Sequence, residues 1–475
     1  MDESALQDLY RRAFGRPPEV SEPLKGDGSA RRLFRLKGGG KTVIGALGPD
    51  PRENRAFLAF SRHFRAQGLN VPEIYAEDQE RGAYLEEDLG DTNLFQYLSA
   101  NRDGAAIAEP VLALYRKTAR ALTRFQFEAG RTLDYSVCYP RGSFDRQSML
   151  WDLNHFKYYF LRLSGTPFDE QALEDDFQRF ADYLLEAPGD FFLYRDFQSR
   201  NVMVRDGEPW FIDYQGGRKG ALQYDAASLL YDAKADLPPT LRKELLEVYL
   251  DAVAERGPAD RAAFMARFPG FVLVRIMQAM GTYGLRGFYE RKTHFLQSIP
   301  YAVRNLESLL AAHELPVKLP ALSEVWRRLA SSETLRKHGS VVSGVLTVRI
   351  QSFAFKGGLP ADESGHGGGF VFDCRALPNP GREKRYAELD GRDGPVADYL
   401  AAVPGVAAFL ERVMGLVDAS VDSYKARSFT DLSVAFGCTG GQHRSVYCAE
   451  ALAEHLRARG VPVRLSHRER DKKAG

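Results

Sequence analysis

Three oxygen-bearing side chains, Asp196, Asn201 and Asp213, stand at spacings that suit the transfer of a phosphoryl group. Two β-type runs separate Asn201 from Asp213, and they flank Asp206-Gly207, a pair typical of a tight hairpin turn. We expect this hairpin to bring Asn201 and Asp213 together. Phosphoryl transfer depends on positioning and on metal neutralisation of phosphate charge, so we assign Asp196 to the acceptor hydroxyl and Asn201 and Asp213 to magnesium. A polar loop beside an ordinary hairpin is the alternative, which the second aspartate argues against.

A second candidate site lies near the C-terminus, where Gly437 to Ser445 reads Gly-Cys-Thr-Gly-Gly-Gln-His-Arg-Ser. A strand-like run, Leu432 to Phe436, precedes it and a helix-compatible stretch follows it. A glycine-rich turn that opens a helix collects free backbone N–H donors at the positive end of the helix dipole, and His443 and Arg444 add side-chain donors. We therefore predict an anion pocket for phosphate. A turn capped by Ser445 is the alternative, but it leaves the clustered Cys, His and Arg unexplained.

The first set of residues needs a scaffold with two lobes. Residues 1–90 mix glycine-rich turns and short β-type runs around one amphipathic helix, in which Phe57, Phe60 and Phe64 share a face. Residues 91–325 are mostly helical by pattern and carry the hairpin. We predict a small α+β lobe followed by a helical lobe, with the site between them.

The second set needs a separate, smaller scaffold. The charged stretch 326–340 is predicted to be a linker, after which a β-type run, Val341 to Ile350, begins a new unit over 341–475. That unit opens with strands and closes with strand, glycine-rich loop and helix, an order that indicates an α/β domain. The predicted fold class is thus an α+β bilobal fold followed by a smaller α/β domain.

Composition limits the classes of function. The 475 residues carry 64 Lys+Arg and 63 Asp+Glu, so no global field draws the protein to nucleic acid or to an anionic membrane. The four cysteines form no CxxC pair, which argues against a zinc or redox motif. The N-terminus lacks a basic start and an apolar core, and no run of 18 apolar residues occurs. We expect a cytoplasmic protein that neither spans nor binds a membrane.

The first site resembles that of the aminoglycoside phosphotransferase superfamily, kin of the protein kinases. The resemblance rests on Tyr194-Arg195-Asp196 and on Tyr224 to Leu230, which looks like the family's Y-D-x-A-S-L-L helix start. It implies a protein-kinase-like fold, ATP and magnesium as cofactors, and a small-molecule hydroxyl as acceptor. It also implies that Asp225 braces the catalytic loop beside Arg195, although capping a helix is a second role for Asp225.

Upstream, Gly26 to Arg35 resembles the loop that covers the nucleotide in this superfamily, and Leu85 to Asp91 resembles its acidic hinge. Small residues let backbone N–H groups approach phosphate oxygens. An ordinary glycine-rich hairpin and a solvated acidic loop are the alternatives. The resemblance implies these nucleotide-binding residues: Gly28, Ser29, Ala30, Arg31, Arg32, Glu86, Glu87, Asp88 and Leu89.

One departure from the family concerns the phosphate-binding lysine of the third strand, which Val43 to Ala46 does not provide. Glu53 is the candidate for the helix glutamate that would pair with it, and Lys41, Arg31 or Arg32 could substitute for the lysine. The same absence resembles the AmgK-like branch of N-acetylmuramate and N-acetylglucosamine anomeric kinases.

The last unit resembles the C-terminal domain of the RNase adapter family RapZ, through Ser352 to Gly358, Phe372 to Pro380 and the G-C-T-G-G-x-H-R-S motif. Members of that family are implicated in binding glucosamine 6-phosphate and small RNAs. Where they carry His after L-P-N-P this chain has Gly381, so ligand specificity stays open. The implied pocket comprises Asp373, Arg375, Cys438, Thr439, Gly440, Gly441, His443, Arg444 and Ser445.

Two further interpretations of the last unit stay open. From residue 341 onward 18 Lys+Arg face 16 Asp+Glu, a net charge of +2, which is weak for RNA binding. Cys438 and Arg444 have the Cys-x5-Arg spacing of cysteine phosphatases, in which a thiolate attacks phosphorus. The family resemblance favours a noncovalent sugar-phosphate pocket.

We therefore hypothesise an ATP-dependent sugar kinase of the N-acetylmuramate/N-acetylglucosamine type, in cell-wall recycling, fused to an amino-sugar-phosphate-binding domain. A kinase of aminoglycoside, choline or another alcohol is the alternative among enzymes. A catalytically silent, RNA-binding regulatory adaptor is the alternative from another class, and the intact Asp196, Asn201 and Asp213 set argues against it.

Overall fold

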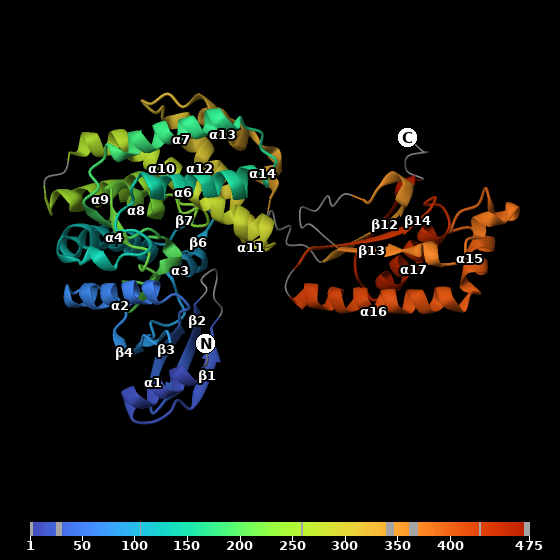
Figure 1. The fold of residues 1–475 in the computed structure, drawn as a ribbon, viewed down its shortest axis with the longest axis horizontal. Helices are drawn as coiled ribbons and strands as arrows, with labels where there is room; N and C mark the ends of the chain where they lie inside the picture. Colours follow the sequence, from blue (N-terminus) through green and yellow to red (C-terminus); the bar gives the residue numbers. More distant parts are fainter. Residues whose placement is uncertain are drawn as a thin grey trace. The chain divides into compact units, whose positions relative to one another are not determined.

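The computed structural model describes residues 3–24, 31–104, 106–257, 260–338, 346–360, 369–426 and 429–469. The chain forms two compact units, Met1–Lys337 and His338–Gly475 (Figure 1). The predicted order, an α+β bilobal unit followed by a smaller α/β domain, is confirmed.

The N-terminal lobe is a five-stranded antiparallel sheet in the order β1-β2-β3-β5-β4. Side chains alternate across it, so Val43 and Leu85 face α1 whereas Tyr84 faces α2. The predicted phenylalanines of α2 are buried, and Asp50 caps that helix by accepting from the Arg52 N–H. The elements are α1 (Ser4–Phe14), β1 (Val20–Pro23), β2 (Arg32–Gly38), β3 (Lys41–Leu47), α2 (Pro51–Ala66), β4 (Ile74–Asp78) and β5 (Ala83–Glu87).

The second lobe is mainly helical, and three of its helices continue as π-helical turns. Its helices and minor strands are α3 (Leu94–Ala100), β6 (Arg102–Asp103), β7 (Ala106–Ile107), α4 (Glu109–Thr123), η1 (Arg124–Ala129), α5 (Gly130–Thr132), η2 (Tyr135–Val137), α6 (Arg146–His155), η3 (Phe156–Leu161), α7 (Glu170–Leu185), α8 (Leu222–Leu230), α9 (Pro239–Ala254), α10 (Arg261–Tyr283), η5 (Gly284–Tyr289), α11 (Thr293–Leu296), α12 (Ile299–Ala312), α13 (Pro320–Ser331) and α14 (Glu333–Lys337).

Helix α10 runs through the core of this lobe. By length and composition, Arg261–Tyr289 could cross a membrane, with a mean hydropathy of 1.2. However, 67% of its apolar window is buried inside the protein, which is the environment of a core helix.

Four short strands carry the catalytic segment: β8 (Phe191–Leu193), β9 (Val202–Arg205), β10 (Glu208–Phe211) and β11 (Arg218–Gly220), with η4 (Ser199–Asn201) before β9. β9 and β10 pair antiparallel and β8 pairs with β11. At the hairpin turn Asp206 and Gly207 have φ of 53° and 73°, the left-handed conformations that a tight two-residue turn requires.

The predicted linker at 326–340 is corrected over most of its length. Residues up to Lys337 belong to the first unit, because α13 and α14 bury Trp326, Leu329 and Leu335 in the helical core. The charged residues of this stretch occupy the outer face of an amphipathic helix.

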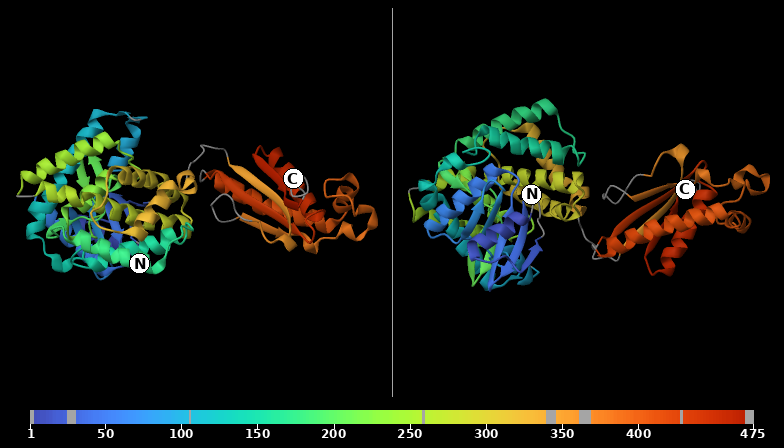
Figure 2. Two further views of the ribbon diagram at one scale, coloured as in Figure 1. Left: turned by 90° about the horizontal axis from the view of Figure 1, so that it is seen from above. Right: turned by 60° about the horizontal axis from the view of Figure 1, so that its bottom comes forward.

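The second unit is built on a parallel sheet in the order β13-β14-β12-β15, against which α17 packs (Figure 2). The two central strands, β14 and β12, are largely buried, whereas the edge strands β13 and β15 are partly exposed. The elements are β12 (Thr347–Ala354), η6 (Phe355–Gly357), β13 (Gly369–Asp373), η7 (Cys374–Ala376), η8 (Pro380–Arg382), η9 (Lys384–Tyr386), α15 (Gly394–Ala401), α16 (Pro404–Ala426), β14 (Asp431–Cys438), α17 (Arg444–Ala458) and β15 (Val463–His467).

Candidate functional site

The three catalytic candidates meet at one end of the β9–β10 hairpin. The Asn201 side-chain nitrogen donates to the Asp196 backbone carbonyl at 2.9 Å and to an Asp213 carboxylate oxygen at 3.3 Å. The side chains of Asp196 and Asp213 are each 42% exposed, so both carboxylates can reach a bound molecule. Asn201 is buried. The predicted juxtaposition of the three residues is therefore observed.

The catalytic loop is held from behind by Asp225. Its two carboxylate oxygens accept from the backbone N–H groups of Tyr194 at 2.7 Å and Arg195 at 3.0 Å. Burial raises the pKa of Asp225 to about 7, against the lowering effect of these two donors. Arg195 makes two hydrogen bonds to Asp152, at 2.5 and 2.7 Å. The bracing that the family resemblance implies for Asp225 and Arg195 matches these contacts.

Two non-glycine residues of the site have left-handed backbones. Arg195 has φ of 85° and Asp213 has φ of 69°. Such conformations cost energy in L-residues and persist where the surrounding structure enforces them. Here the hydrogen bonds of Asp225 and the hairpin supply that constraint.

Arg31 pairs with Glu53, the residue predicted to pair with the phosphate-binding lysine that the third strand lacks. Its side chain is 9% exposed and its Nη2 donates to Glu53 on α2 at 2.9 Å and to Asp213 at 3.5 Å. Its Nη1 donates to the Tyr84 hydroxyl on β5 at 3.2 Å. Burial alone would lower the pKa of Arg31, but Tyr84, Asp213 and Glu53 together raise it by more than burial lowers it. The net pKa is therefore above its ordinary value, and the guanidinium stays charged.

The other candidate cations lie elsewhere. Arg32 donates to Glu3 at 2.5 Å and is half exposed, because adjacent residues of a strand point to opposite faces. The Lys41 ammonium lies over the Phe14 ring on the α1 side of the sheet. Of the three substitutes considered for the missing lysine, Arg31 is the one seen to contact Glu53 and Asp213 among the described residues. The predicted loop residues Gly28, Ser29 and Ala30 lie outside the described residues.

Two of the predicted hinge side chains form ion pairs, one with the helical lobe and one with β2. The Glu87 carboxylate accepts from Arg205 at 2.6 Å. The Asp88 carboxylate accepts from Arg35 at 2.7 and 3.0 Å. Leu89 is buried, and in the described part of the chain its backbone N–H has no recorded acceptor. A free backbone donor at this point suits recognition of a base.

Glu86 behaves differently from its neighbours. It is two residues from Tyr84 on β5 and so shares the face that looks toward Arg31. One of its carboxylate oxygens is buried with no hydrogen-bond partner among the described residues. Burial raises its pKa to about 7; the Arg31 charge lowers it and the Asp213 charge raises it. This carboxyl can accept an N–H from a bound molecule.

Arg275 on α10 is a candidate that the motif search missed. Its Nη2 lies 3.4 Å from a carboxylate oxygen of Asp196 and its Nε donates to Ser228 at 2.9 Å. Its Nη1 donates to the side chain of Gln278. Only 5% of its side chain is exposed, so its charge acts in a partly desolvated setting. The sequence signal was an arginine inside an otherwise apolar helix.

The donor set fits magnesium. The Asn201 side-chain nitrogen faces the Asp196 carbonyl, which leaves its amide oxygen as a ligand, and Asp213 supplies a carboxylate. Magnesium takes one or two protein oxygens together with phosphates and water. No group of three or more His, Cys, Asp or Glu side chains in the described ranges could hold a metal.

The predicted anion loop of the second unit joins β14 to α17. Thr439 and Gly440 are exposed, whereas Arg444 and Ser445 are buried. Arg444 donates to the backbone carbonyls of Arg375 and Leu377, both at 2.9 Å, and so fixes the neighbouring segment. The loop therefore offers backbone donors at its mouth.

Neighbouring side chains frame this loop. Asp373 and Arg375 pair at 2.6 Å and are about half exposed. His443 contacts the Tyr386 carbonyl at 2.9 Å. A Cβ on Gly381 would lie 3.1 Å from the His443 ring, a tighter contact than side chains normally make, so the glycine lets this predicted ligand residue pack closely against the segment at 381.

The Cys438 sulfur lies inside the loop. The Gly441 N–H donates to it at 3.2 Å, and the Ser445 hydroxyl lies 3.2 Å away. Gly441 has φ of 67°, and a side chain there would meet the Glu469 side chain and the backbone at 353–354. The sulfur thus anchors the loop from within.

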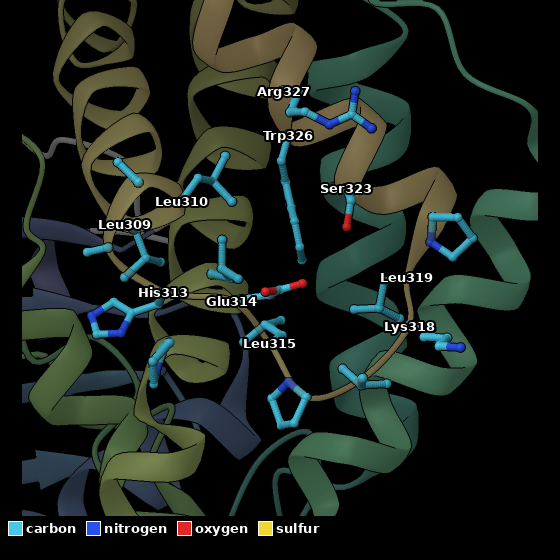
Figure 3. Close-up of a pocket in the computed structure, with 17 residues that line it drawn as sticks. Leu309, Leu310, His313, Glu314, Leu315, Lys318, Leu319, Ser323, Trp326 and Arg327 are labelled. Carbon is cyan, nitrogen blue, oxygen red and sulfur yellow. The ribbon is translucent and has the colours of Figure 1, made fainter.

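A groove in the first unit is separate from the catalytic candidates (Figure 3). It has a volume of about 1130 Å³ and is formed by α10, α12, α13 and the segment between the last two. Leu309, Leu315 and Trp326 supply its apolar walls. None of the predicted site residues lines it.

Sequence profiles of two families match the chain. The profile of the phosphotransferase enzyme family matches residues 21–264, and that of the RapZ C-terminal domain matches residues 346–471. The predicted pair of families and the kinase-like fold class are thereby confirmed. The matches do not distinguish the N-acetylmuramate/N-acetylglucosamine branch.

Two curated relatives each match about a quarter of the chain. A nucleotide-binding protein of Cupriavidus pinatubonensis is 48% identical over 124 residues, which is 26% of this chain and 40% of that protein. One of Laribacter hongkongensis is 44% identical over 129 residues, 27% of this chain and 45% of that protein. The chain thus spans less than half the length of these relatives.

Solved structures resemble the first unit at a distance. A choline kinase of Cryptosporidium parvum is 12% identical, with a TM-score of 0.44 over 65% of this chain and 98% of that one. An amicoumacin kinase in complex with AMP-PNP and calcium is 14% identical, with a TM-score of 0.44 over 70% of this chain and 93% of that one.

Proposed function

Because the chain belongs to the phosphotransferase enzyme family and is a kinase of small-molecule hydroxyl groups, we propose that its acceptor is a sugar, of the N-acetylmuramate or N-acetylglucosamine type. The observation that carries the proposal is the meeting of Asp196, Asn201 and Asp213 beside the Arg31–Glu53 pair. ATP is the proposed donor, and the proposed setting is cytoplasmic cell-wall recycling.

The proposed reaction is an in-line transfer. The oxygen of the acceptor hydroxyl bonds to the γ-phosphorus while Asp196 accepts the hydroxyl proton. At the same time the bond from phosphorus to the β,γ-bridging oxygen breaks, and ADP leaves. Arg31 neutralises phosphate charge, since Glu53 and Tyr84 orient it at the site. Magnesium, held by Asn201 and Asp213, supplies further neutralisation when bound.

Charge around Asp196 supports a neutral or anionic acceptor. The described side chain that contacts its carboxylate is the cationic Arg275. The acidic Asp152 nearby is already bound by Arg195 through two hydrogen bonds. Aminoglycosides and choline are cations. Uncompensated carboxylates would strengthen their binding, whereas a buried guanidinium group would weaken it by repulsion. A sugar without positive charge fits this arrangement better.

Exposed aromatic rings on η3 and η5, inclined to each other at 67°, form an apolar patch that is proposed to face the acceptor. Tyr159 and Tyr289 are 36% and 69% exposed and their ring centroids lie 6.5 Å apart. The His155 ring lies 4.9 Å from that of Tyr159, and burial lowers the pKa of His155, so its ring is neutral at pH 7. Such a patch is typical of a ligand-binding surface.

The second unit is proposed to bind an amino-sugar phosphate through its anion loop. Backbone donors at Thr439 and Gly440 would hold the phosphate, and the exposed Arg375 would approach it. Its curated relatives are named nucleotide-binding proteins, and nucleotides share the phosphate chemistry. A small RNA is the weaker proposal for this unit, because its net charge is low.

The test is a panel of sugars, aminoglycosides and choline offered with ATP and magnesium to the intact protein and to Asp196→Ala. Mass spectrometry would identify the product and the position of the phosphate. We expect transfer to a sugar by the intact protein and its loss in Asp196→Ala, with nucleotide binding retained. Transfer only to a cationic alcohol would replace the sugar proposal. No transfer to any acceptor, together with a salt-dependent RNA gel shift at physiological ionic strength, would favour the adaptor.

A further inference from the structure

A second pocket of the helical lobe lies where α9 begins, and arginines predominate in its charged lining. It has a volume of about 450 Å³, which is within the usual range of small-molecule sites. Its walls come from β6, the segment before α9, the first turn of α9 and α12. The catalytic candidates are not among the residues that line it. Its charged lining residues are Arg102, Arg242, Arg304, Asp236 and Glu307.

Arg242, in the first turn of α9, is buried in the wall of this pocket without an acidic partner. It is 9% exposed, its Nη2 donates to the Asn305 side-chain oxygen at 2.6 Å, and its guanidinium lies over the Tyr231 ring. Its Nε is buried with no hydrogen-bond partner among the described residues. Burial lowers the pKa of Arg242 by more than Tyr231 and Asp236 raise it, and Arg304 lowers it further. The surrounding protein therefore compensates this charge incompletely.

The two acidic residues of the lining are each balanced by a cation of their own. An Asp236 carboxylate oxygen lies 3.0 Å from an Arg304 nitrogen, and a Glu307 carboxylate oxygen lies 2.8 Å from an Arg336 nitrogen. Both carboxylates stay charged and both face a guanidinium group. They balance Arg304 and Arg336 and leave the remaining two arginines of the lining uncompensated.

Arg102 is the other arginine of the lining that forms no ion pair within the described ranges. Its three guanidinium nitrogens donate to three neutral backbone carbonyls, at distances of 2.8 to 3.0 Å. These bonds fix the side chain but carry no opposite charge. Together with Arg242 it leaves two positive charges at one pocket, and a phosphate monoester carries about −1.5 to −2 at pH 7.

The start of α9 adds backbone donors to the same place. Pro238 is the N-cap residue and offers no side-chain acceptor, and Pro239 has no N–H. The first bond of the helix runs from the Arg242 N–H to the Pro238 carbonyl at 3.0 Å. In the part of the chain that the structure describes, the N–H groups of Thr240 and Leu241 have no recorded acceptor. Free donors at the positive end of a 16-residue helix favour a phosphate group.

We propose that this pocket binds the phosphate group of a small phosphate ester, held by Arg242 and the free N–H groups of α9. Asn305 orients the arginine, since its side-chain oxygen accepts from Arg242 while its nitrogen donates to the Tyr231 carbonyl at 3.2 Å. A planar guanidinium suits phosphate, and charged hydrogen bonds of this kind are the stronger ones. The site goes beyond the proposed transfer reaction and does not depend on which acceptor the kinase uses.

The test is a calorimetric titration of inorganic phosphate into the full chain at constant ionic strength, with sodium chloride as the balancing salt. In Arg242→Gln we expect the affinity of one phosphate site to fall by about tenfold or more, the size of a lost hydrogen bond to a charged group. Asp236→Asn should instead tighten binding about threefold, because it removes a negative charge from the lining. Asp236 has φ of 44°, a conformation that asparagine tolerates. Unchanged affinity in Arg242→Gln, or a loss in Asp236→Asn, would overturn the proposal.

Lys243→Gln is the matched control. Lys243 is the next residue of α9, is exposed, and does not line the pocket. The change should leave the phosphate affinity unaltered. A loss in Lys243→Gln equal to that in Arg242→Gln would mean general attraction to a basic surface, and the proposal would fail.

A third variant covers the case in which Arg242→Gln does not fold, which its melting transition without phosphate would show. Arg304→Gln removes a lining cation whose side chain is half exposed, so it should fold and weaken phosphate binding about threefold. Unchanged affinity in this variant would count against the site.

A crystallographic measurement locates the bound anion. Crystals of the full chain soaked in tungstate, which has the geometry of phosphate, should give an anomalous signal beside Arg242. A signal only at the catalytic hairpin or at the loop between β14 and α17 would overturn the proposal. Neither experiment involves an acceptor or turnover, so failure of this site and failure of the proposed sugar kinase are distinguishable.

Discussion

The two proposed phosphate sites of this chain are built in opposite ways. In the first unit the charged groups come from separate elements, Arg31 from the start of β2, Glu53 from α2 and Asp213 from beyond β10, and they face one another. In the second unit one contiguous loop between β14 and α17 supplies the donors, and its arginine is bound to backbone carbonyls. The first arrangement surrounds the proposed position of the phosphoryl group with side chains of both signs, which suits stabilisation of the charge that develops during transfer. The second offers fixed donors, as retention of an anion requires.

The largest expected effect separates the two sites. Asp213→Asn removes the carboxylate proposed to hold magnesium while keeping the side chain's size, so kcat should fall by about 10³-fold or more. Binding of glucosamine 6-phosphate by the second unit of the full chain should not change. Rates would be measured with N-acetylglucosamine over a range of magnesium concentrations, and binding by calorimetry. Equal loss of both functions would show that the sites are not independent.

A double-mutant cycle sharpens the claim that the first site is assembled from separate elements. Arg31→Ala should raise KM for ATP and lower kcat, a loss of about 10²-fold in kcat/KM. Glu53→Gln should cost less, and the double variant should cost little more than Arg31→Ala alone, because Glu53 acts by orienting Arg31.

Lys41→Ala is the control for this cycle, since that lysine lies over Phe14 on the far side of the sheet. If Lys41→Ala lowers kcat/KM as much as Arg31→Ala does, then Lys41 on the third strand, and not Arg31, binds the phosphate.

The first unit also contains a buried carboxyl group, Glu86, whose raised pKa should make the stability of that unit depend on pH. The pKa of Glu86 is about 7 in the folded state, against 4.5 for the ordinary carboxyl. A carboxyl pKa that is raised in the folded state does not affect the free energy of unfolding below pH 4.5. It lowers that free energy progressively between pH 4.5 and 7, and by a constant amount above pH 7. The penalty is on the order of 1–3 kcal/mol. Glu86→Gln should therefore raise the melting temperature of the first unit at pH 8 and have little effect at pH 4.5.

Differential scanning calorimetry of the full chain at the two pH values measures this effect. The melting transition of the second unit provides an internal reference, since no described contact joins Glu86 to it. A melting temperature that Glu86→Gln changes equally at both pH values would contradict the assigned cause.

How far the sequence predicted these sites depends on how local each one is. Asp196, Asn201 and Asp213 lie within 18 residues, and one hairpin turn sets their geometry, so motif and turn chemistry were enough to predict it. The loop that contains Cys438 was predictable for the same reason. Both predictions needed only local rules.

The rest depended on tertiary packing. Arg31 and Arg32 are adjacent, and only the direction of β2 decides which of them faces the nucleotide side. Arg275 lies 79 residues after Asp196, so no local pattern connects them. The stretch 326–340 was wrongly predicted as a linker because its charges were weighed above Trp326 and Leu329, whose spacing already suited a buried helical face.

The smallest expected effect tests whether the second site only holds its ligand. In Cys438→Ser the hydroxyl oxygen can still accept the Gly441 N–H and pair with Ser445, so the loop should keep its shape. We expect the affinity for glucosamine 6-phosphate to change less than about threefold, within the spread of a conservative polar exchange. Neither protein should release phosphate from p-nitrophenyl phosphate. Phosphate release by the intact chain that Cys438→Ser abolishes would mean that the thiolate attacks phosphorus, and the second site would then be one of transfer like the first. Arg444 argues against that outcome, because its side chain is buried and its Nη1 already donates to two backbone carbonyls, which directs part of the guanidinium group toward the neighbouring segment.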